Sequence, residues 1–361
     1  MQCFPARART NLGGVGHRNP SWDLGKHTLI RVGVVGYGYW GPNIVRNLRS
    51  LEGCQVVAVC DQSPAALRRI RQAHPDLAVT TQSAELLTSA EVDAIAVVTP
   101  VGTHFELAKA ALENGKHVFV EKPFTSTVCQ AEELIELAER KNLKIMVDHT
   151  FLFTGAVRKI RELIDEGVLG DLYYYDSTRV NLGLFQHDVS VVWDLAPHDL
   201  SIMSFLIPQE PEAVVATGQA HLNGLVDVAF LTVYFPGNTI AHINVNWLSP
   251  VKVRTTLLGG EKKMLVWNDL EADEKLKIYD KGAQLSSGQG LYELMVSYRS
   301  GDMWAPRVEQ TEALRVELGH FLDCVTKDQT PLNDGLAGLR VVKLLEAADR
   351  SLKERGRAVE V

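Results

Sequence analysis

An apolar stretch from Leu29 to Val35 leads directly into the glycine-rich segment Gly36-Tyr37-Gly38-Tyr39-Trp40-Gly41-Pro42. Glycines spaced as GxGxxG between a strand and a helix permit a tight turn, close backbone approach to a pyrophosphate, and close packing of helix on strand. Pro42 suits a first helical turn, because its missing N–H costs nothing there. The remaining free N–H groups of such a turn bind anions. The segment predicts a dinucleotide site, with a ligand-free glycine turn as the alternative.

A second expected strand, residues 55–60, ends at Asp61, about twenty residues beyond the glycines. In a dinucleotide-binding fold, an acidic side chain at this distance hydrogen-bonds the ribose 2′-hydroxyl of NAD. Its negative charge repels the 2′-phosphate of NADP. NAD is therefore the expected cofactor. The alternative is that Asp61 caps the helix that begins near Ser63-Pro64, since Asp, Ser and Thr all serve as caps.

Expected strands and helices alternate up to residue 150. The later strands cover 93–99, 118–122 and 144–148, and the helices cover about 63–74, 84–88, 103–114 and 126–141. Such alternation predicts a doubly wound parallel sheet, in which ligands bind at the carboxyl ends of the strands. Four candidate site residues fall at such ends: Gly36, Asp61, Thr99 and Lys122.

After residue 150 the pattern changes. A helix over 155–166, a strand over 172–180 and the segment 191–207 precede six strands without intervening helices: 212–220, 226–235, 239–248, 253–258, 263–267 and 275–280. Consecutive strands of this kind predict an antiparallel sheet. The polar segment 284–308 is expected to be a loop, and two helices, roughly 309–326 and 335–354, close the chain.

The predicted fold class is α/β, with an N-terminal Rossmann domain built on a doubly wound parallel sheet and a C-terminal α+β domain with an open antiparallel sheet. A chain of 361 residues exceeds the usual single-domain length. The predicted division is a disordered extension over 1–28, an NAD-binding domain over 29–150, a substrate and oligomerisation domain over 151–330, and a closing C-terminal helix over 331–361.

Composition excludes several classes of protein. The net charge of −7 argues against nucleic acid or an anionic membrane as a partner, although a phosphorylated small substrate needs only local positive charge. The five cysteines are odd in number and form no CxxC pair, so neither a disulfide framework nor a metal site is expected. No signal-peptide core or membrane-spanning run is found, so a cytoplasmic protein is predicted.

Several motifs together resemble the glucose-fructose oxidoreductase / inositol dehydrogenase / MocA (Gfo/Idh/MocA) family over about residues 29–358. They are the early GxGxxG, Thr99-Pro100 followed by His104, Gly115-Lys116-His117-Val118, Glu121-Lys122-Pro123, and Asp194 with His198 four residues on. Glu-Lys-Pro at this distance from the glycines is the most specific of them.

This resemblance implies that Lys122 lies beside the nicotinamide and that Asp194 and His198 face it from the second domain. Oxidising a secondary alcohol needs a base for the hydroxyl proton, which a partly desolvated lysine or a histidine can supply. The alternatives are a solvated strand-end lysine and a helix-face histidine bonded to backbone. Pro197 is expected to fit a helix here only in its first turn. The implied cofactor contacts are Gly36, Gly38, Tyr39, Trp40, Gly41, Asp61, Thr99, Pro100, His104, Glu121 and Lys122.

Segments 179–183 and 193–199 resemble the branch that oxidises C3 of UDP-N-acetylglucosaminuronic acid in bacterial cell-surface sugar pathways. Arg179 and Asn181 end an expected strand and are candidate ligands for a carboxylate or diphosphate, the alternatives being a loop salt bridge and an Asn turn. Many family members carry Arg or Tyr shortly after the strand equivalent to 144–148. This chain has His149 there, which is a candidate substrate or nicotinamide contact or else a buried structural histidine.

The expected function is NAD-dependent oxidation of a secondary hydroxyl on a nucleotide sugar. The alternatives are an inositol or glucose dehydrogenase, a sugar ketoreductase, or a catalytically silent dinucleotide-binding sensor. A catalytically silent sensor is disfavoured, because the chain has all three candidate catalytic residues, Lys122, Asp194 and His198. The strands over 226–248 look too apolar to face water on both sides, so a homodimer or homotetramer through this sheet is expected.

Overall fold

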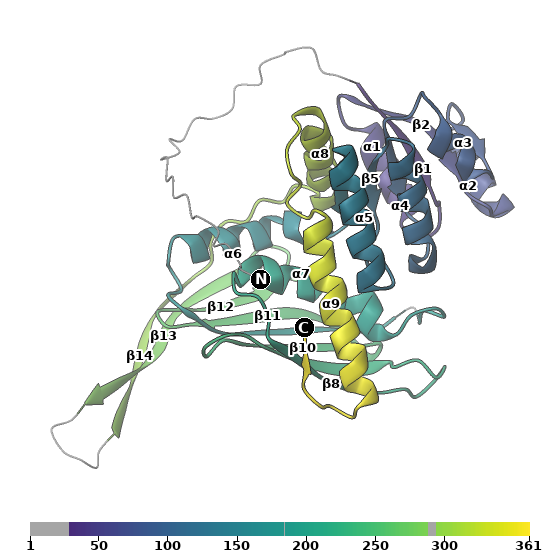
Figure 1. The fold of residues 1–361 in the computed structure, drawn as a ribbon. Helices are drawn as coiled ribbons and strands as arrows, with labels where there is room; N and C mark the ends of the chain where they lie inside the picture. The colour runs from purple at the N-terminus through teal and green to yellow at the C-terminus, as the bar shows by residue number, and fades with distance from the viewer. Residues whose placement is uncertain (1–28, 184, 288–293) are drawn as a thin grey trace, which may run out of the picture.

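The computed structural model describes residues 29–183, 185–287 and 294–361, arranged as two sheets joined by helices (Figure 1). The predicted extension over 1–28 lies outside the described residues. Across the described part of the chain, no helix has the length and apolar composition needed to cross a bilayer.

The N-terminal sheet contains six parallel strands in the order β3-β2-β1-β4-β5-β6. Helices cover both faces, which is why strands such as β4 are buried throughout. The strand order reverses between β1 and β4, and ligands of doubly wound sheets bind at this switch point. The strands are β1 (Ile30–Val35), β2 (Cys54–Cys60), β3 (Ala78–Thr80), β4 (Ala94–Val97), β5 (His117–Val120) and β6 (Ile145–Val147). The helices are α1 (Gly41–Arg49), α2 (Pro64–Ala73), α3 (Ser83–Thr88), η1 (Val101–Thr103), α4 (His104–Glu113) and α5 (Val128–Lys141).

The second sheet has nine strands in the order β14-β13-β12-β11-β7-β10-β9-β8-β15. Its pairs are antiparallel except for β7 with β10, so the sheet is mixed, and the predicted fold class is otherwise confirmed. The strands are β7 (Leu172–Leu182), β8 (Ala213–Gln219), β9 (Val228–Tyr234), β10 (Ile240–Asn246), β11 (Leu248–Gly260), β12 (Met264–Asn268), β13 (Leu276–Ser287), β14 (Leu294–Trp304) and β15 (Val359–Glu360).

Helices cover one face of this second sheet. They are η2 (Thr150–Phe153), α6 (Gly155–Asp165), α7 (Val191–Leu206) and α9 (Gly335–Lys353), of which α7 packs on β7 and β10 and α9 packs on β8. Leu231 and Val233 of β9 are buried on the helix side, whereas Phe230 and Tyr234 are exposed on the other. The alternation shows that the outward face of this sheet carries large apolar side chains.

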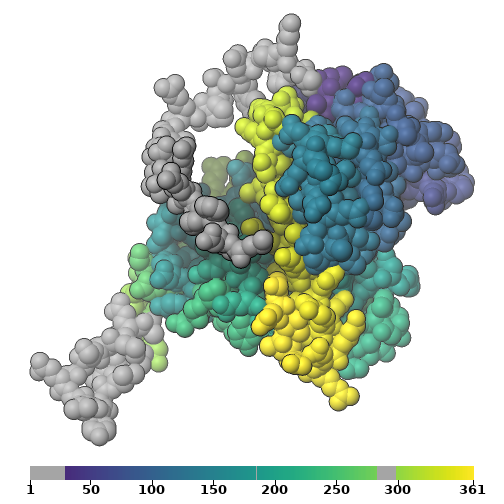
Figure 2. Space-filling view, viewed as in Figure 1, coloured from purple at the N-terminus to yellow at the C-terminus, as the bar shows by residue number. Residues whose placement is uncertain are grey.

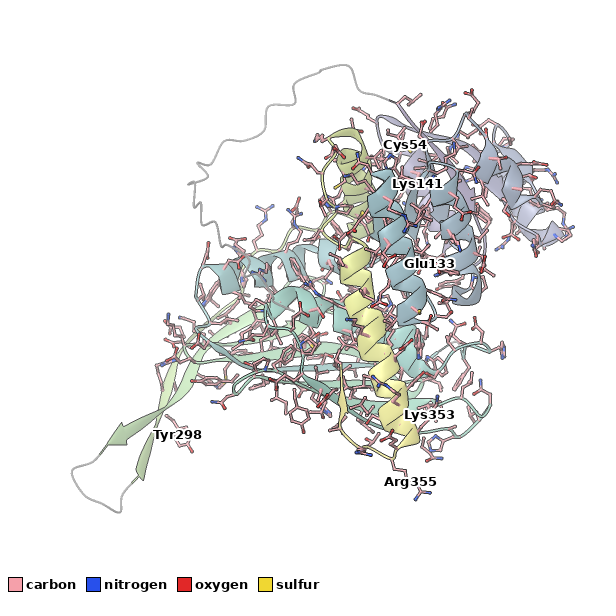
Figure 3. The ribbon with its side chains drawn as sticks, viewed as in Figure 1. Cys54, Glu133, Lys141, Tyr298, Lys353 and Arg355 are labelled. Atoms are coloured by element: carbon pink, nitrogen blue, oxygen red, sulfur yellow. The ribbon has the colours of Figure 1, made fainter. Side chains whose placement is uncertain are left out.

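The prediction of a loop over 284–308 was wrong for its first part. Strands β13 and β14 pair as a long hairpin that projects from the body of the protein (Figure 1). Figure 3 shows Tyr298 on this hairpin with its side chain away from the body, where it is exposed. Residues 300–304 of β14 are all exposed, and a stretch of strand that buries neither face lacks the apolar alternation that identifies a strand in sequence.

The C-terminal helices connect the two sheets. Helix α8 (Ala313–Thr326) packs on α1 and η2, and α9 packs on α5 and α7. Arg46 of α1 forms an ion pair with Glu312, the residue that precedes α8, at 2.6 Å. In Figure 2, α8 and α9 form a yellow band that runs down the face shown, beside the blue helices of the N-terminal part. The carboxyl ends of the parallel strands therefore have a fixed position relative to α7.

Candidate active site

The glycine loop has the geometry that its sequence predicts. Gly36 has φ +104°, and a Cβ there would lie 2.2 Å from the carbonyl oxygen of Val98. A Cβ at Gly41 would lie 2.7 Å from the carbonyl oxygen of Gly36. At Gly38, by contrast, no described atom lies within 4 Å of the Cβ position. Packing therefore requires glycine at the first and third positions, and the backbone at Gly38 is open to a ligand.

Asp61 joins this loop to the start of α2. Its Oδ2 accepts a hydrogen bond from the Tyr37 backbone N–H and its Oδ1 from that of Ser63, each at 2.7 Å. Ser63 is the residue whose side chain caps α2, by accepting from Ala66 N–H at 3.4 Å. Each oxygen of Asp61 has capacity for a further bond. A ribose hydroxyl could therefore still bind to it, and this role stays a prediction.

Asp61→Ala is expected to narrow the preference for NAD over NADP by about fivefold or more. Two like charges about 4 Å apart in water repel by roughly 1 kcal/mol, and the substitution removes that repulsion. Arg69, which donates to the Tyr37 carbonyl oxygen at 2.9 Å, lies beside the same loop and offers a cation to a 2′-phosphate. Fluorescence titration with both cofactors measures the effect. Asp76→Ala, which removes an exposed carboxylate between α2 and β3 that pairs with Arg49, is the control. Equal affinities in the wild type would contradict the prediction.

Lys122 lies immediately after β5 and reaches the second half of the chain. Its Nζ donates to the carbonyl oxygen of Asp194 at 2.8 Å and lies 3.3 Å from Asp194 Oδ1. Both side chains are largely buried. The peptide bond that follows, Lys122-Pro123, is cis. The structure thus brings together two of the three residues expected to carry the chemistry.

Helix α7 presents Asp194 and His198 one turn apart. Residues four apart in a helix lie on the same face, and on this face Asp194 contacts Lys122 while His198 contacts Phe151. The expectation that Pro197 requires a first turn was wrong, because α7 continues through it. A proline inside a helix has no N–H and its ring crowds the preceding turn. In that turn the carbonyl oxygen of Asp194 accepts from Lys122.

His198 is buried among cations. Its ring contacts Phe151 edge-on, with 5.0 Å between ring centroids. Burial holds the pKa of His198 well below its usual range, and the charges of Lys122, Arg179 and Arg254 lower it further. Its Nδ1 has no hydrogen-bond partner among the described residues. The imidazole is therefore neutral, and its Nδ1 can take part in a hydrogen bond with a bound ligand.

Arg179 lies inside β7, which extends to Leu182, and not at a strand end. Its Nε donates to Asp199 Oδ2 at 2.6 Å, both side chains are buried, and its guanidinium lies 4.4 Å from the Phe151 centroid. The salt-bridge alternative therefore describes its geometry, although the salt bridge joins β7 to helix α7 and does not lie in a loop. Asn181 is half-buried near the end of the same strand. Their roles as substrate ligands stay predictions.

Arg254 is a site residue that the sequence did not reveal. In the sheet register it lies directly opposite Arg179, on β11. Its guanidinium lies 5.5 Å from the centroid of Phe151 and 3.2 Å from Asp269 Oδ2. Its side chain is 34% exposed, whereas that of Arg179 is only 7% exposed. Of the two guanidinium groups, Arg254 is thus the one that a solute can reach.

A group of buried acids lies next to β6. Asp148 accepts from the Trp40 indole Nε1 at 3.1 Å, which connects the glycine loop to the end of β6. Burial, and then the charge of Asp148, raise the pKa of Glu121 well above its usual range. Burial also lowers the pKa of the adjacent His149 to about 3, and neither of its ring nitrogens has a partner among the described residues. His149 is thus neutral and close to Lys122.

His104 supports the turn that carries Lys122. Its ring nitrogens lie 2.9 Å from the carbonyl oxygen of Pro123 and 2.7 Å from that of Thr99. It thereby connects the end of β4 to the residue after Lys122. The contact between the His104 ring and the Thr99 carbonyl oxygen, five residues earlier, accounts for the Thr-Pro-x-x-x-His spacing. Direct cofactor contact by Thr99, Pro100, His104 or the exposed Tyr39 stays a prediction.

Comparison with family models gives two matches. Residues 30–149 match the oxidoreductase family with an NAD-binding Rossmann fold, Gfo/Idh/MocA, and residues 157–266 match the Gfo/Idh/MocA C-terminal domain. The predicted cofactor, NAD, is confirmed at the level of the family. The open backbone at Gly38 and the carboxylate of Asp61 fit such a dinucleotide.

Similar proteins include sugar and inositol dehydrogenases. The chain is 27% identical to UDP-N-acetylglucosamine 3-dehydrogenase of Acidithiobacillus ferrooxidans, over 87% of this chain and 94% of the relative. It is 25% identical to scyllo-inositol 2-dehydrogenase (NAD(+)) of Bacillus subtilis, over 84% and 88%. A solved structure of the Acidithiobacillus enzyme superimposes with a TM-score of 0.75 at 24% identity, covering 90% of this chain and 98% of that one. Motifs, fold and both family matches agree, and the chain belongs to the Gfo/Idh/MocA family of oxidoreductases.

Proposed function

We propose that this protein is an NAD-dependent dehydrogenase that oxidises the C3 hydroxyl of a nucleotide sugar, such as UDP-N-acetylglucosaminuronic acid. The observation that carries the proposal is the convergence of Lys122, Asp194 and His198 at the carboxyl end of β5, beside the accessible guanidinium of Arg254. The relative that acts on C3 of UDP-N-acetylglucosamine supports the choice of carbon and of nucleotide.

The proposed reaction converts a secondary alcohol and NAD⁺ into a ketone, NADH and one proton. Bound NAD supplies the acceptor for the hydride, which takes both electrons of the carbinol C–H bond. The hydroxyl proton passes to the lone pair of Lys122 Nζ as the C–O bond becomes a carbonyl, and the neutral His198 ring hydrogen-bonds the sugar. As the free amine, Lys122 has two N–H donors, which the carbonyl and carboxylate oxygens of Asp194 accept, so that its lone pair faces the sugar hydroxyl.

An anionic substrate is supported by the local charges. Three ion pairs lie near the site: Lys122 with Asp194, Arg179 with Asp199, and Arg254 with Asp269. Lys275 also lies 3.7 Å from Asp269 Oδ1, so Arg254 and Lys275 share one carboxylate. A diphosphate or uronic carboxylate can therefore pair with the guanidinium of Arg254, even though the whole chain has a net charge of −7.

A neutral polyol is the second candidate substrate, because inositol dehydrogenases of Rhizobium meliloti and Bacillus subtilis are among the relatives, at 24% and 25% identity. NADH absorbance during incubation with UDP-N-acetylglucosaminuronic acid, UDP-N-acetylglucosamine, glucose and myo-inositol separates the candidates. The proposal expects fastest turnover of the uronic acid. Faster turnover of free inositol or glucose would replace it, and cofactor binding without any turnover would favour the sensor.

We also propose that the protein forms a homodimer or homotetramer through the outward face of the second sheet. Phe230, Tyr234 and Ile240 are exposed on neighbouring strands, and Tyr234 and Ile240 are register partners. Large apolar side chains gathered on one face are typical of an interface. Sedimentation velocity compares the wild type with Phe230→Asp, and a monomeric wild type would contradict the proposal.

A further inference from the structure

We infer that Trp247 is a positioning residue, whose indole N–H holds the Asp194 carboxylate in the orientation that Lys122 needs. The inference rests on the proposed function, because it concerns the Lys122–Asp194 pair. Trp247 joins β10 to β11, far from α7 in sequence, and it belongs to none of the motifs that the family resemblance uses.

The geometry at Asp194 assigns one partner to each carboxylate oxygen. Oδ2 accepts from Trp247 Nε1 at 3.2 Å, and Oδ1 lies 3.3 Å from Lys122 Nζ. Two partners on opposite oxygens fix the plane of a carboxylate, because rotation about the Cβ–Cγ bond would break both contacts. The shorter bond from Lys122 goes to the Asp194 carbonyl oxygen, at 2.8 Å. The carboxylate is thus held partly away from the lysine.

Trp247 is itself a rigid donor. It is 2% exposed, its backbone N–H donates to the carbonyl oxygen of Asp227 at 2.9 Å, and Phe185 contacts its ring with 5.5 Å between centroids. Phe185 belongs to the segment that leads into α7. A buried indole N–H cannot bond to bulk water, so loss of its acceptor would be costly. Asp194 is therefore constrained from the sheet as well as from its own helix.

Without the indole N–H, the carboxylate can turn both oxygens toward Lys122. A carboxylate with both oxygens on Lys122 favours the ammonium form, which has no lone pair for the hydroxyl proton, while the NAD site around the glycine loop would be unaffected. Trp247→Phe removes the N–H and keeps most of the ring volume. The expected effect is a fall in kcat of about tenfold, which corresponds to the free energy that one hydrogen bond to a charged group typically contributes. The KM for NAD is expected to stay within about twofold.

Trp267→Phe is the matched control. Trp267 on β12 is also 2% exposed, and its indole nitrogen has no partner among the described residues. The same atoms are removed from a buried aromatic position of the same sheet. A general loss of packing would affect both variants, whereas the positioning role lowers kcat only in Trp247→Phe.

The contact can also be tested without activity and without a tryptophan variant. In protein labelled with ¹⁵N-tryptophan, Asp194→Asn is expected to shift one of the six indole resonances strongly, because an amide is a weaker acceptor than a carboxylate. An unchanged indole spectrum would overturn the inference.

The kinetic outcomes separate the inference from the proposed function. If Lys122→Ala is inactive but Trp247→Phe turns over as fast as Trp267→Phe, the inference fails and the proposed function stands. If Lys122→Ala turns over at the wild-type rate, the proposed function fails, and the indole spectrum still decides whether Trp247 binds Asp194.

Discussion

Lys122→Ala is expected to lower turnover by roughly 10²–10⁴ while the affinity for NAD stays within a few-fold, as is typical of lost acid–base catalysis. Lys122 Nζ reaches across from β5 to Asp194, and a base at this point can take the hydroxyl proton as the hydride leaves. The glycine loop and Asp61, where the cofactor is expected to bind, do not depend on it. Single-turnover NADH formation, with NAD binding measured by fluorescence, checks both parts.

Two further variants separate charge from proton transfer. Lys122→Arg keeps a positive charge but cannot give up its proton, so it is expected to bind both ligands and remain slow. Lys141→Ala removes a lysine at the end of α5 that only bonds the carbonyl oxygen of Glu113, and it is the control for charge loss. Turnover of Lys122→Ala near the wild-type rate would disprove the assignment.

The N-terminal part was predictable because its signals are local. Five of the six strands of the parallel sheet were predicted as short apolar runs, whereas the three-residue strand β3, which is not buried, was missed. Gly36 shows the principle, since its φ of +104° and its contact with Val98 are possible only for glycine. The sequence also identified Lys122, Asp194 and His198, because their motifs combine residue type with fixed spacing.

Contacts across the second sheet were not predictable. Arg254 lies opposite Arg179 because β11 pairs with β7 in one register, and nothing local in either strand specifies that register. The indole of Trp247 reaches Asp194 across 53 residues of chain, through the packing of α7 on the sheet, which no local pattern specifies either. The expectation that Pro197 lies in the first turn of a helix was wrong because it considered the helix alone, where an internal proline lowers stability. Packing of α7 between the second sheet and helix α9 offsets that cost here.

The pairing of Arg179 with Asp199 changes what its removal should do. If Arg179 binds the anionic group of the substrate, as its residue type suggested, Arg179→Ala should raise the KM for a UDP-sugar acid by well over tenfold. In the structure, that variant would also leave Asp199 buried without its partner, which typically destabilises a protein by about 3–5 kcal/mol. A lower Tm is therefore expected alongside any change in KM, so this variant cannot by itself identify the substrate's anionic group.

Arg254→Ala is the sharper test of an anionic substrate. Arg254 is partly exposed, stacks on Phe151 near His198, and shares Asp269 with Lys275, so its loss leaves that carboxylate paired. Truncating one partner of a charged hydrogen bond costs about 2–5 kcal/mol, and the lower end applies to a partly exposed side chain. The KM for UDP-N-acetylglucosaminuronic acid is therefore expected to rise about 30-fold, with little change in Tm.

Comparing two substrates on this variant shows which group Arg254 binds. UDP-N-acetylglucosamine has the diphosphate but no carboxylate. If Arg254 binds the carboxylate, its removal should raise the KM only for the uronic acid, whereas binding of the diphosphate should raise both values equally. Lys275→Ala removes the same charge from Asp269 but has no contact with Phe151, so it should change neither KM greatly. Unchanged KM values for both substrates in Arg254→Ala would mean that the cation does not face the substrate, and the case for a nucleotide sugar would lose its electrostatic support.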